Sequence, residues 1–555
     1  MPDPPSQGDS PSQTSQNPTK EDSKPPPNPE TSRGLVTLLL TKSNLILTEI
    51  NTFQSLLSQK LRNPQLIEIR SLRSSIVSEL RTLEKLSDRI EAAFAAAEQK
   101  GDGEEEVEAR YIHALRSSNL PFYEAVWGIA KGSCRGLAAF GKRFYWGEGA
   151  VEDVDGDADT GKKKGKGKKD GEDGKKLPNK DKRKSVLVDI VADDGEEWVK
   201  VSTISESRLL FEMAEKGWEK ESEPGSDDED EGKGRTVLRN YEDEDEDDED
   251  DEVGLIKLAM DMRRAANATR VRYRRPQIRF VLPRIEEQKS SDIDDLIDTI
   301  RGYGITVECG GRYTEVSDSQ TAENQLSHLL PSHFIRFTPS LNVDCTLLLA
   351  MVSDLSHCKS VQPSPEHHTA INRQIEIERE HPLLPVEIWP ATVDREMLCT
   401  DEAAKRMQEI VDTIGTDTEK KRTDVLLGVP PFDGLDSDTL VQKFQELSDY
   451  EVPTHWRLPI KTVEARPVID SGRKQAKLPP IVESVAEMLS DINYSVFLYG
   501  WVTGLVTISS NRTVVRQIET TVENHRNGDE DLVGPTVWVC DTPRSLIGKE
   551  RNRRE

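Results

Sequence analysis

Long apolar runs are missing from this chain of 555 residues, because no stretch approaches the roughly 20 apolar residues that a transmembrane helix needs. The first 33 residues are rich in Pro, Ser, Gln and Asn, and they lack the basic segment followed by an apolar segment that marks a signal peptide. These two absences predict a protein that lies inside the cell and off the membrane, in the cytoplasm or the nucleus.

Cysteine is sparse and unordered. No two cysteines form a CxxC pair, and none has the Cys/His spacing of a zinc ligand set. The pattern argues against a zinc site and favours reduced thiols. The six cysteines are Cys134, Cys309, Cys345, Cys358, Cys399 and Cys540.

Several catalytic motifs are also absent. The chain has no phosphate-binding glycine loop of the Walker type and no nucleophile elbow. Four histidines lie close together in sequence, but their spacing does not resemble a helical metal-binding pair, and we expect them in a proline-rich loop. These histidines are His357, His367, His368 and His381.

Charge, in contrast, is abundant: the formal net charge is −27 and 32% of the residues are charged. Much of the excess acid sits in blocks at 227–231 and 242–252, so we expect a disordered acidic insertion over 221–252. We also expect a disordered leader over 1–33 and a disordered Gly/Lys linker over 147–184. The lysine clusters in this linker are candidates for a nuclear import signal or a phosphate-contacting patch, although interspersed acids weaken both readings.

Residues 34–146 are predicted to be helical. Apolar residues recur at helical spacing from Leu35 to the Asn63-Pro64 break, and Ile69 to Phe94 step by three and four along a second helix. We expect an antiparallel hairpin, with a shorter helix around 120–140 packed against it. A partner-binding coiled coil is the alternative.

Residues 185–315 are predicted to form a small α/β region. Strands at 186–191 and 198–201 flank a turn at Asp193-Asp194-Gly195, which predicts a β-hairpin. Further on, a strand at 277–282, a helix at 293–300, glycines and a strand at 305–309 predict a βαβ unit with parallel strands.

Residues 332–548 repeat this alternation, which predicts an α/β sandwich. The expected strands are 341–344, 396–399, 505–508 and 536–540, and a helix follows each of the first three. The segment 426–477 is interrupted by prolines and gives little beyond a helix near 440–447.

Polar residues fall at the carboxyl ends of these strands. If the strands are parallel, Asp344, Asp401 or Glu402, Asn511 and Asp541 converge on one edge of the sheet. A cluster of carboxylates there could bind Mg²⁺ or Mn²⁺ and activate water for phosphodiester hydrolysis. Plainer readings stand beside this one, because acids in the first turn of a helix and before a Thr-Pro turn have structural uses.

A basic stretch surrounds Tyr273. It could contact a phosphate backbone, or it could offset the acidic insertion that precedes it. Its members are Arg263, Arg264, Arg270, Arg272, Arg274 and Arg275.

Three segments carry a resemblance to a known family. Residues 188–201, 341–348 and above all 534–548, with the sequence GPTVWVCDTPRSLIG, resemble a eukaryotic family called domain of unknown function 1308. The resemblance covers most of the chain from about Leu35 to Lys549. It implies that the C-terminal half is similar to a PIN-type nuclease domain, arranged as a three-layer α/β sandwich.

In PIN domains a first-strand Asp, a helix-borne Glu and late Asp residues bind the metal. The resemblance assigns these roles to Asp344, loosely to Glu402, and to Asp541, with Mg²⁺ or Mn²⁺ as the cofactor. The late strand ends in Ser509-Ser510-Asn511, without the acid that the PIN pattern expects.

The leading functional expectation is a degenerate PIN-like module that binds RNA or protein partners. The first alternative is a divalent-metal-dependent ribonuclease that uses Asp344, Glu402 and Asp541. A scaffold that acts through the N-terminal helical hairpin is the second alternative.

Overall fold

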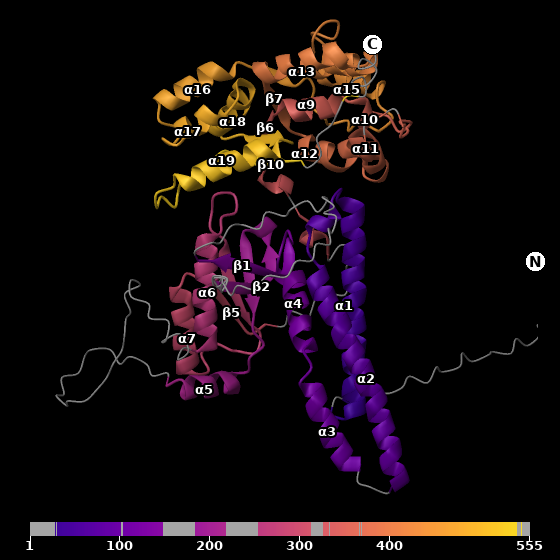
Figure 1. Cartoon of the computed structure of the whole chain (residues 1–555), viewed down its shortest axis with the longest axis vertical. Coiled ribbons are helices and arrows are strands. Elements are labelled where there is room, and N and C mark those ends of the chain that lie inside the picture. The colour runs from indigo at the N-terminus through magenta and orange to yellow at the C-terminus, as the bar shows by residue number, and fades with distance from the viewer. Residues whose placement is uncertain are drawn as a thin grey trace, which may run out of the picture. The chain divides into compact units, whose positions relative to one another are not determined.

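The computed structural model describes residues 28, 30–100, 104–147, 184–217, 253–311, 326–331, 333–365, 367, 369–540 and 546 (Figure 1). The predicted acidic insertion, nearly all of the predicted leader and nearly all of the predicted Gly/Lys linker lie outside these residues. The chain divides into two compact units. The first holds residues 1–45 and 77–120, and the second holds residues 46–76 and 121–555.

The first unit is built from three helical segments. It contains the beginning of α1 (Ser32–Lys60), the greater part of α2 (Arg70–Lys100) and α3 (Glu104–Arg116). Arg33, near the start of α1, pairs with Glu91 at 2.8 Å and lies over the Phe94 ring, near the end of α2. Because the start of one helix meets the end of the other, α1 and α2 run antiparallel, and the predicted hairpin is confirmed.

In the second unit, the rest of the hairpin packs against α4 (Leu120–Ser133), whose Trp127 indole donates to the Glu49 carboxylate at 2.6 Å. The helix predicted around 120–140 is too long. It ends at Ser133, Gly136 takes a φ of +53°, and Ala139–Trp146 is strand β1. The aromatic residues of 139–146 favour a strand, and this strand pairs antiparallel with β2.

Five strands form the first sheet, in the order β1-β2-β3-β4-β5. The β2–β3 pair is antiparallel, which confirms the predicted β-hairpin. The β3–β4 and β4–β5 pairs are parallel, which confirms the predicted βαβ unit of β4, α7 and β5. The remaining strands are β2 (Lys184–Ala192), β3 (Glu197–Val201), β4 (Gln277–Leu282) and β5 (Thr306–Cys309), and the helices are α5 (Glu206–Glu215), α6 (Gly254–Ala268) and α7 (Ser291–Gly302). Short 3-10 turns η1 (Pro64–Leu66) and η2 (Asp193–Gly195) connect elements.

The second sheet is entirely parallel, in the order β10-β9-β6-β7-β8. The sequence predicts four of its strands. It misses β8, which has a single apolar residue, Val463, and lies in the proline-interrupted segment 426–477. The strands are β6 (Ser340–Val343), β7 (Glu396–Thr400), β8 (Lys461–Val463), β9 (Val506–Ser509) and β10 (Val537–Val539).

Helices and turns surround this sheet. Those before β8 are η4 (Ser327–Leu329), η5 (His333–Arg336), α9 (Cys345–Val352), α10 (Asp354–His357), α11 (Thr369–Glu380), the π-helical turn η6 (Leu384–Ile388), α12 (Trp389–Thr392), α13 (Asp401–Ile414), α14 (Asp417–Leu427) and α15 (Ser437–Gln445). Those after it are α16 (Ala465–Lys474), α17 (Val482–Met488), α18 (Asp491–Thr503) and α19 (Arg512–Asn524). No helix in the described part of the chain is long and apolar enough to span a membrane.

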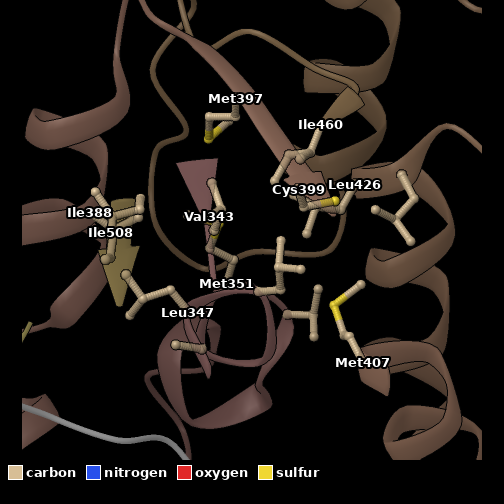
Figure 2. Packing of buried hydrophobic residues seen from close by; sticks show 14 of the residues in the cluster. Val343, Leu347, Met351, Ile388, Met397, Cys399, Met407, Leu426, Ile460 and Ile508 are labelled. Atoms are coloured by element: carbon tan, nitrogen blue, oxygen red, sulfur yellow. The ribbon is translucent and has the colours of Figure 1, made fainter. Parts of the chain in front are cut away.

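The strands present alternate residues to two different layers, as a sheet covered on both faces requires. Figure 2 shows the first layer, where Val343, Ile508 and Cys399 from three strands lie among Leu347, Met351 and Met407 from α9 and α13. The second cluster joins α16, α17, α18 and α19 and includes Val537 and Val539 of β10. The predicted α/β sandwich is confirmed, with helices on both faces.

The histidine prediction is wrong for His357. This side chain is completely buried in α10, where Nε2 lies 2.7 Å from the Met351 carbonyl oxygen and Nδ1 lies 2.9 Å from the Ser448 hydroxyl. The sequence does not reveal this because α10 is a single turn, set off from α9 by Ser353. His368 lies outside the described residues.

Candidate functional site

The strand order places a switch in chain direction beside β6. From β6 the chain moves to β7 and then β8, and it later returns to the other side of β6 as β9 and then β10. In open parallel sheets, ligands collect at the carboxyl ends of the strands where the order reverses, because the two connecting loops diverge there. The carboxyl ends of β6 and β9 are therefore the candidate site of this sheet.

Asp344 lies at this position, directly after β6 and at the N-cap of α9. It is 2% exposed, and its Oδ2 accepts hydrogen bonds from the Ser509 hydroxyl at 2.6 Å and from the Thr346 hydroxyl at 2.7 Å. Its backbone amide donates to the Ile508 carbonyl at 3.0 Å. In the described residues no cation forms an ion pair with this carboxylate. Asp344 is a buried acid that is satisfied by hydroxyls.

The same hydroxyls also fix the loop that follows β9. The Asn511 amide donates to Ser509 Oγ at 3.0 Å, and the Ser510 amide donates to Thr346 Oγ1 at 3.1 Å. Asn511 then caps α19, because its Oδ1 accepts from the Val514 amide at 3.3 Å. The Asp344 carboxylate is thus the centre of a closed network that joins the end of β6, the start of α9 and the start of α19.

Burial governs the protonation of Asp344. Desolvation raises the pKa of its carboxyl, and the hydrogen bonds from Ser509, Thr346 and the amides at the start of α9 oppose that rise. A carboxyl that is this buried, and whose hydrogen bonds are made within the fold, has no open face toward a substrate. Its chemistry in this arrangement is structural.

Glu402 lies in the first turn of α13, just beyond β7. Arg466 Nε donates to its Oε1 at 3.3 Å, and the same guanidinium donates to Asp491 Oδ1 at 3.1 Å. Glu402 Oε2 is buried, and a hydrogen bond with the Glu402 side chain lowers the pKa of the neighbouring Asp401 carboxyl. Asp401 pairs with Lys405 at 3.5 Å. Both acids therefore face cations of the chain itself.

The predicted metal ligands are Asp344, Glu402 and Asp541. Asp344 and Glu402 follow neighbouring strands, but Asp541 lies outside the described residues. No group of three or more His, Cys, Asp or Glu residues in the described part of the chain could hold a metal ion. The strand β9 ends in Ser509, which donates to Asp344 rather than adding a carboxylate. The described side chains do not fit a divalent cation.

The sequence did not lead us to predict a buried polar layer between α18 and the sheet. The face of the sheet that α18 covers is polar and fully buried, because Asn342 donates to the Thr507 hydroxyl at 2.9 Å and the Thr400 and Ser495 hydroxyls lie 3.0 Å apart. The signal was present. Leu341 to Asp344 and Val506 to Ser509 both alternate apolar and polar residues, which is unusual for parallel strands covered on both faces.

Comparisons with known proteins bear on the same region. The model of a family described as a protein of unknown function, DUF1308, matches residues 341–431, which include Leu341–Val343 of β6, Asp344 and Glu402. No curated protein matches the chain, and no solved structure does. The C-terminal region of this chain contains a domain of the DUF1308 family.

Proposed function

We propose that the C-terminal domain is a degenerate PIN-like recognition module, which binds a partner at the carboxyl edge of its sheet and does not hydrolyse phosphodiesters. The parallel order β10-β9-β6-β7-β8 and the Asp at the end of its central strand support the PIN-like assignment. A similar arrangement of strands does not determine activity, because the chemistry of a site depends on its side chains.

The observation that carries the proposal is the set of contacts at Asp344. Metal-dependent hydrolysis needs two or more carboxylates whose oxygens face an open site, where they can hold the divalent cation that activates water. Here the Asp344 carboxylate accepts from Ser509 and Thr346, and it is 2% exposed. Hydroxyl groups stand where further acids would be needed. In this arrangement Asp344 is a structural centre, and the edge around it is the proposed recognition surface.

The charge of the domain favours a protein partner over RNA. Residues 332–548 contain 33 Asp and Glu and 21 Lys and Arg, a difference of −12. Binding to nucleic acid depends largely on neutralising phosphates with basic side chains, and a domain with this excess of acid repels a polyanion. A protein partner with a basic surface fits this charge.

The cleavage test separates the proposal from the metal-dependent ribonuclease. The position of Asp344 and Glu402 after neighbouring strands favours that second candidate. The full chain is incubated with labelled single-stranded RNA and Mn²⁺ or Mg²⁺, beside an Asp344→Ala variant shown by circular dichroism to be folded. The proposal expects no cleavage by either protein. Metal-dependent cleavage that the variant loses would establish the ribonuclease instead.

Recognition is tested with photo-cross-linking residues at two exposed lysines on opposite edges of the same sheet. Lys405 lies in α13 beyond the carboxyl end of β7, and its side chain is 71% exposed. Lys461, the matched control, begins β8 at the amino edge and is 59% exposed. We expect protein adducts at position 405 and not at 461. RNA adducts at 405, or equal labelling of both positions, would contradict the proposal.

The scaffold role of the helical hairpin stays a prediction. Leu45 on α1 is 59% exposed, but a single exposed leucine is normal on a protein surface and does not define a docking patch.

A further inference from the structure

The basic stretch contains a tight turn with an unusual backbone. Val271 and Arg274 exchange two backbone hydrogen bonds, at 2.9 and 3.0 Å, around the two residues between them. Those residues, Arg272 and Tyr273, have φ angles of +50° and +70°. Two-residue turns with both central residues in the left-handed region strongly prefer Asn-Gly or Gly-Gly. Bulky side chains are unfavourable at both positions, so contacts outside the turn must hold this conformation.

Arg272 supplies contacts on one side. Its guanidinium donates to Asp194 Oδ2 at 3.3 Å and to Glu196 Oε1 at 3.1 Å, both beside the turn between β2 and β3 of the first sheet. Arg336 joins the same group and donates to Asp193 Oδ2 at 2.7 Å. One central side chain of the turn is therefore attached to the small α/β region.

Tyr273 supplies contacts on the other side, where it lies in the buried cluster of the C-terminal domain. It is 8% exposed and shares that cluster with Val515, Ile518 and Val522 of α19. Its ring lies so close to Gly534 that a Cβ at that glycine would come within 2.4 Å of the tyrosine Cζ. Only glycine at position 534 leaves room for the aromatic ring.

Charged groups at and just beyond the end of α19 contact the Tyr273 backbone and the arginines that flank the turn. Arg526, which is 7% exposed, donates to the Tyr273 carbonyl oxygen at 3.1 Å and to Glu523 Oε1 at 2.7 Å. Arg270 donates to Glu530 Oε2 at 2.7 Å, and Arg275 also pairs with Glu530. Arg270 and Arg275, which flank the turn, and Arg526 thus pair with two glutamates, Glu523 and Glu530. The second central side chain is attached to α19.

We propose that the turn 271–274 is an intramolecular latch, which holds α19 in place from its C-terminal end and so positions the 509–511 loop of the candidate site. Helix α19 connects the two places directly. Glu523 lies at one end, and Asn511 caps the other end with its Oδ1 while its backbone amide donates to Ser509 Oγ. The latch itself follows from the contacts above. Its effect on partner binding rests on the proposed function.

The contacts of this turn also bear on whether the basic stretch binds nucleic acid. Arg270, Arg272 and Arg275 are each paired with acidic side chains of the folded chain. A guanidinium in such a pair has to break it before it can contact a phosphate. The arrangement assigns these three arginines to holding the fold rather than to nucleic acid.

Hydrogen exchange of the full chain, followed by mass spectrometry, tests the latch without any partner. Tyr273→Ala removes the inserted ring and Gly534→Ala displaces it, so we expect exchange of amides 510–524 to accelerate at least about tenfold in both variants. Tyr273→Phe keeps the ring and should leave exchange within about twofold of the parent. Tyr145→Ala, at a tyrosine that is 43% exposed on β1, is the matched control and should also leave it unchanged.

Folded Tyr273→Ala protein with parental exchange over 510–524 would overturn the proposal. If that variant does not fold, Glu530→Lys tests the ion pairs instead, with Asp531→Lys as a control for the same change of charge at the next residue, which is exposed. Faster exchange in Glu530→Lys alone supports the latch, and equal exchange in both overturns it. Because these readouts need no partner, failure of the latch and failure of the proposed recognition are distinguishable.

Discussion

The Ser509 hydroxyl donates to Asp344 Oδ2 at 2.6 Å, across the boundary between strands β9 and β6. Ser509 is completely buried and Asp344 is 2% exposed, so the bond is shielded from water. Hydrogen bonds to ionised groups are stronger than neutral ones, and leaving a buried carboxylate without its donor is costly. The two residues together make the candidate site a structural centre.

Ser509→Ala should lower the free energy of unfolding by about 1–3 kcal/mol, because it leaves a buried carboxylate short of one donor. Urea unfolding at neutral pH measures the change. Ser510→Ala is the matched control: its hydroxyl is buried without a partner among the described residues, so its loss should cost nothing. An equal loss of stability in both variants would contradict the role given to Ser509.

His357 should make stability depend on pH. Burial lowers the pKa of this imidazole from 6.5 to about 3. Between about pH 6.5 and 3 the imidazole is therefore protonated in the unfolded chain and neutral in the folded chain. The free energy of unfolding falls as the pH decreases through this range, by at most about 1.4 kcal/mol per pH unit. Unfolding free energies of His357→Gln and the parent, compared between pH 7 and 4.5, should show a smaller slope in the variant. Equal slopes in the two proteins would contradict this prediction.

The ion pair between Arg422 and Asp354 should be worth far more than a surface pair. Its N···O distance is 2.6 Å and the arginine side chain is 1% exposed. Removing one partner of a buried pair leaves an uncompensated charge, so Arg422→Met should destabilise the protein by about 3–5 kcal/mol. Lys443→Met breaks an exposed pair with Glu446 and should cost below about 1 kcal/mol. Similar thermal shifts for the two variants would refute this ranking.

Gly500→Ala should destabilise the domain because α18 approaches the sheet closely at this residue. A Cβ there would lie 2.1 Å from Thr507 Oγ1, and overpacking of this kind costs about 1–3 kcal/mol. In a double-mutant cycle, Thr507→Ala removes the clashing oxygen. The combined variant should therefore be more stable than the sum of the two single losses predicts. Simple additivity would mean that the close approach is not the cause.

Much of this fold was predictable because long elements show their period. The hairpin helices repeat apolar residues every three or four positions over 29 and 31 residues, and the central strands form continuous apolar or alternating runs. Two elements were missed for local reasons. β8 has a single apolar residue, Val463, inside the proline-interrupted segment 426–477, and β1 was merged with the preceding helix because both are rich in apolar residues.

The candidate site was predictable in position but not in chemistry. The carboxyl ends of β6 and β7 follow from the alternation of strands and helices, and Asp344 and Glu402 do lie there. Which groups meet these acids depends on side chains far away in sequence: Ser509 for Asp344 and Arg466 for Glu402. The pairing of an acid with a hydroxyl 165 positions later has no local signature.

The polar layer under α18 has a consequence for how the domain assembles. A helix that covers only hydrocarbon can slide by a turn and still bury its surface. Here a displaced α18 would separate Asn342 from the Val496 carbonyl and Thr400 from Ser495, and each stranded group would penalise the wrong arrangement. The position of α18 is therefore fixed by the unpaired polar groups that any displaced position would create, and not by a larger buried apolar area.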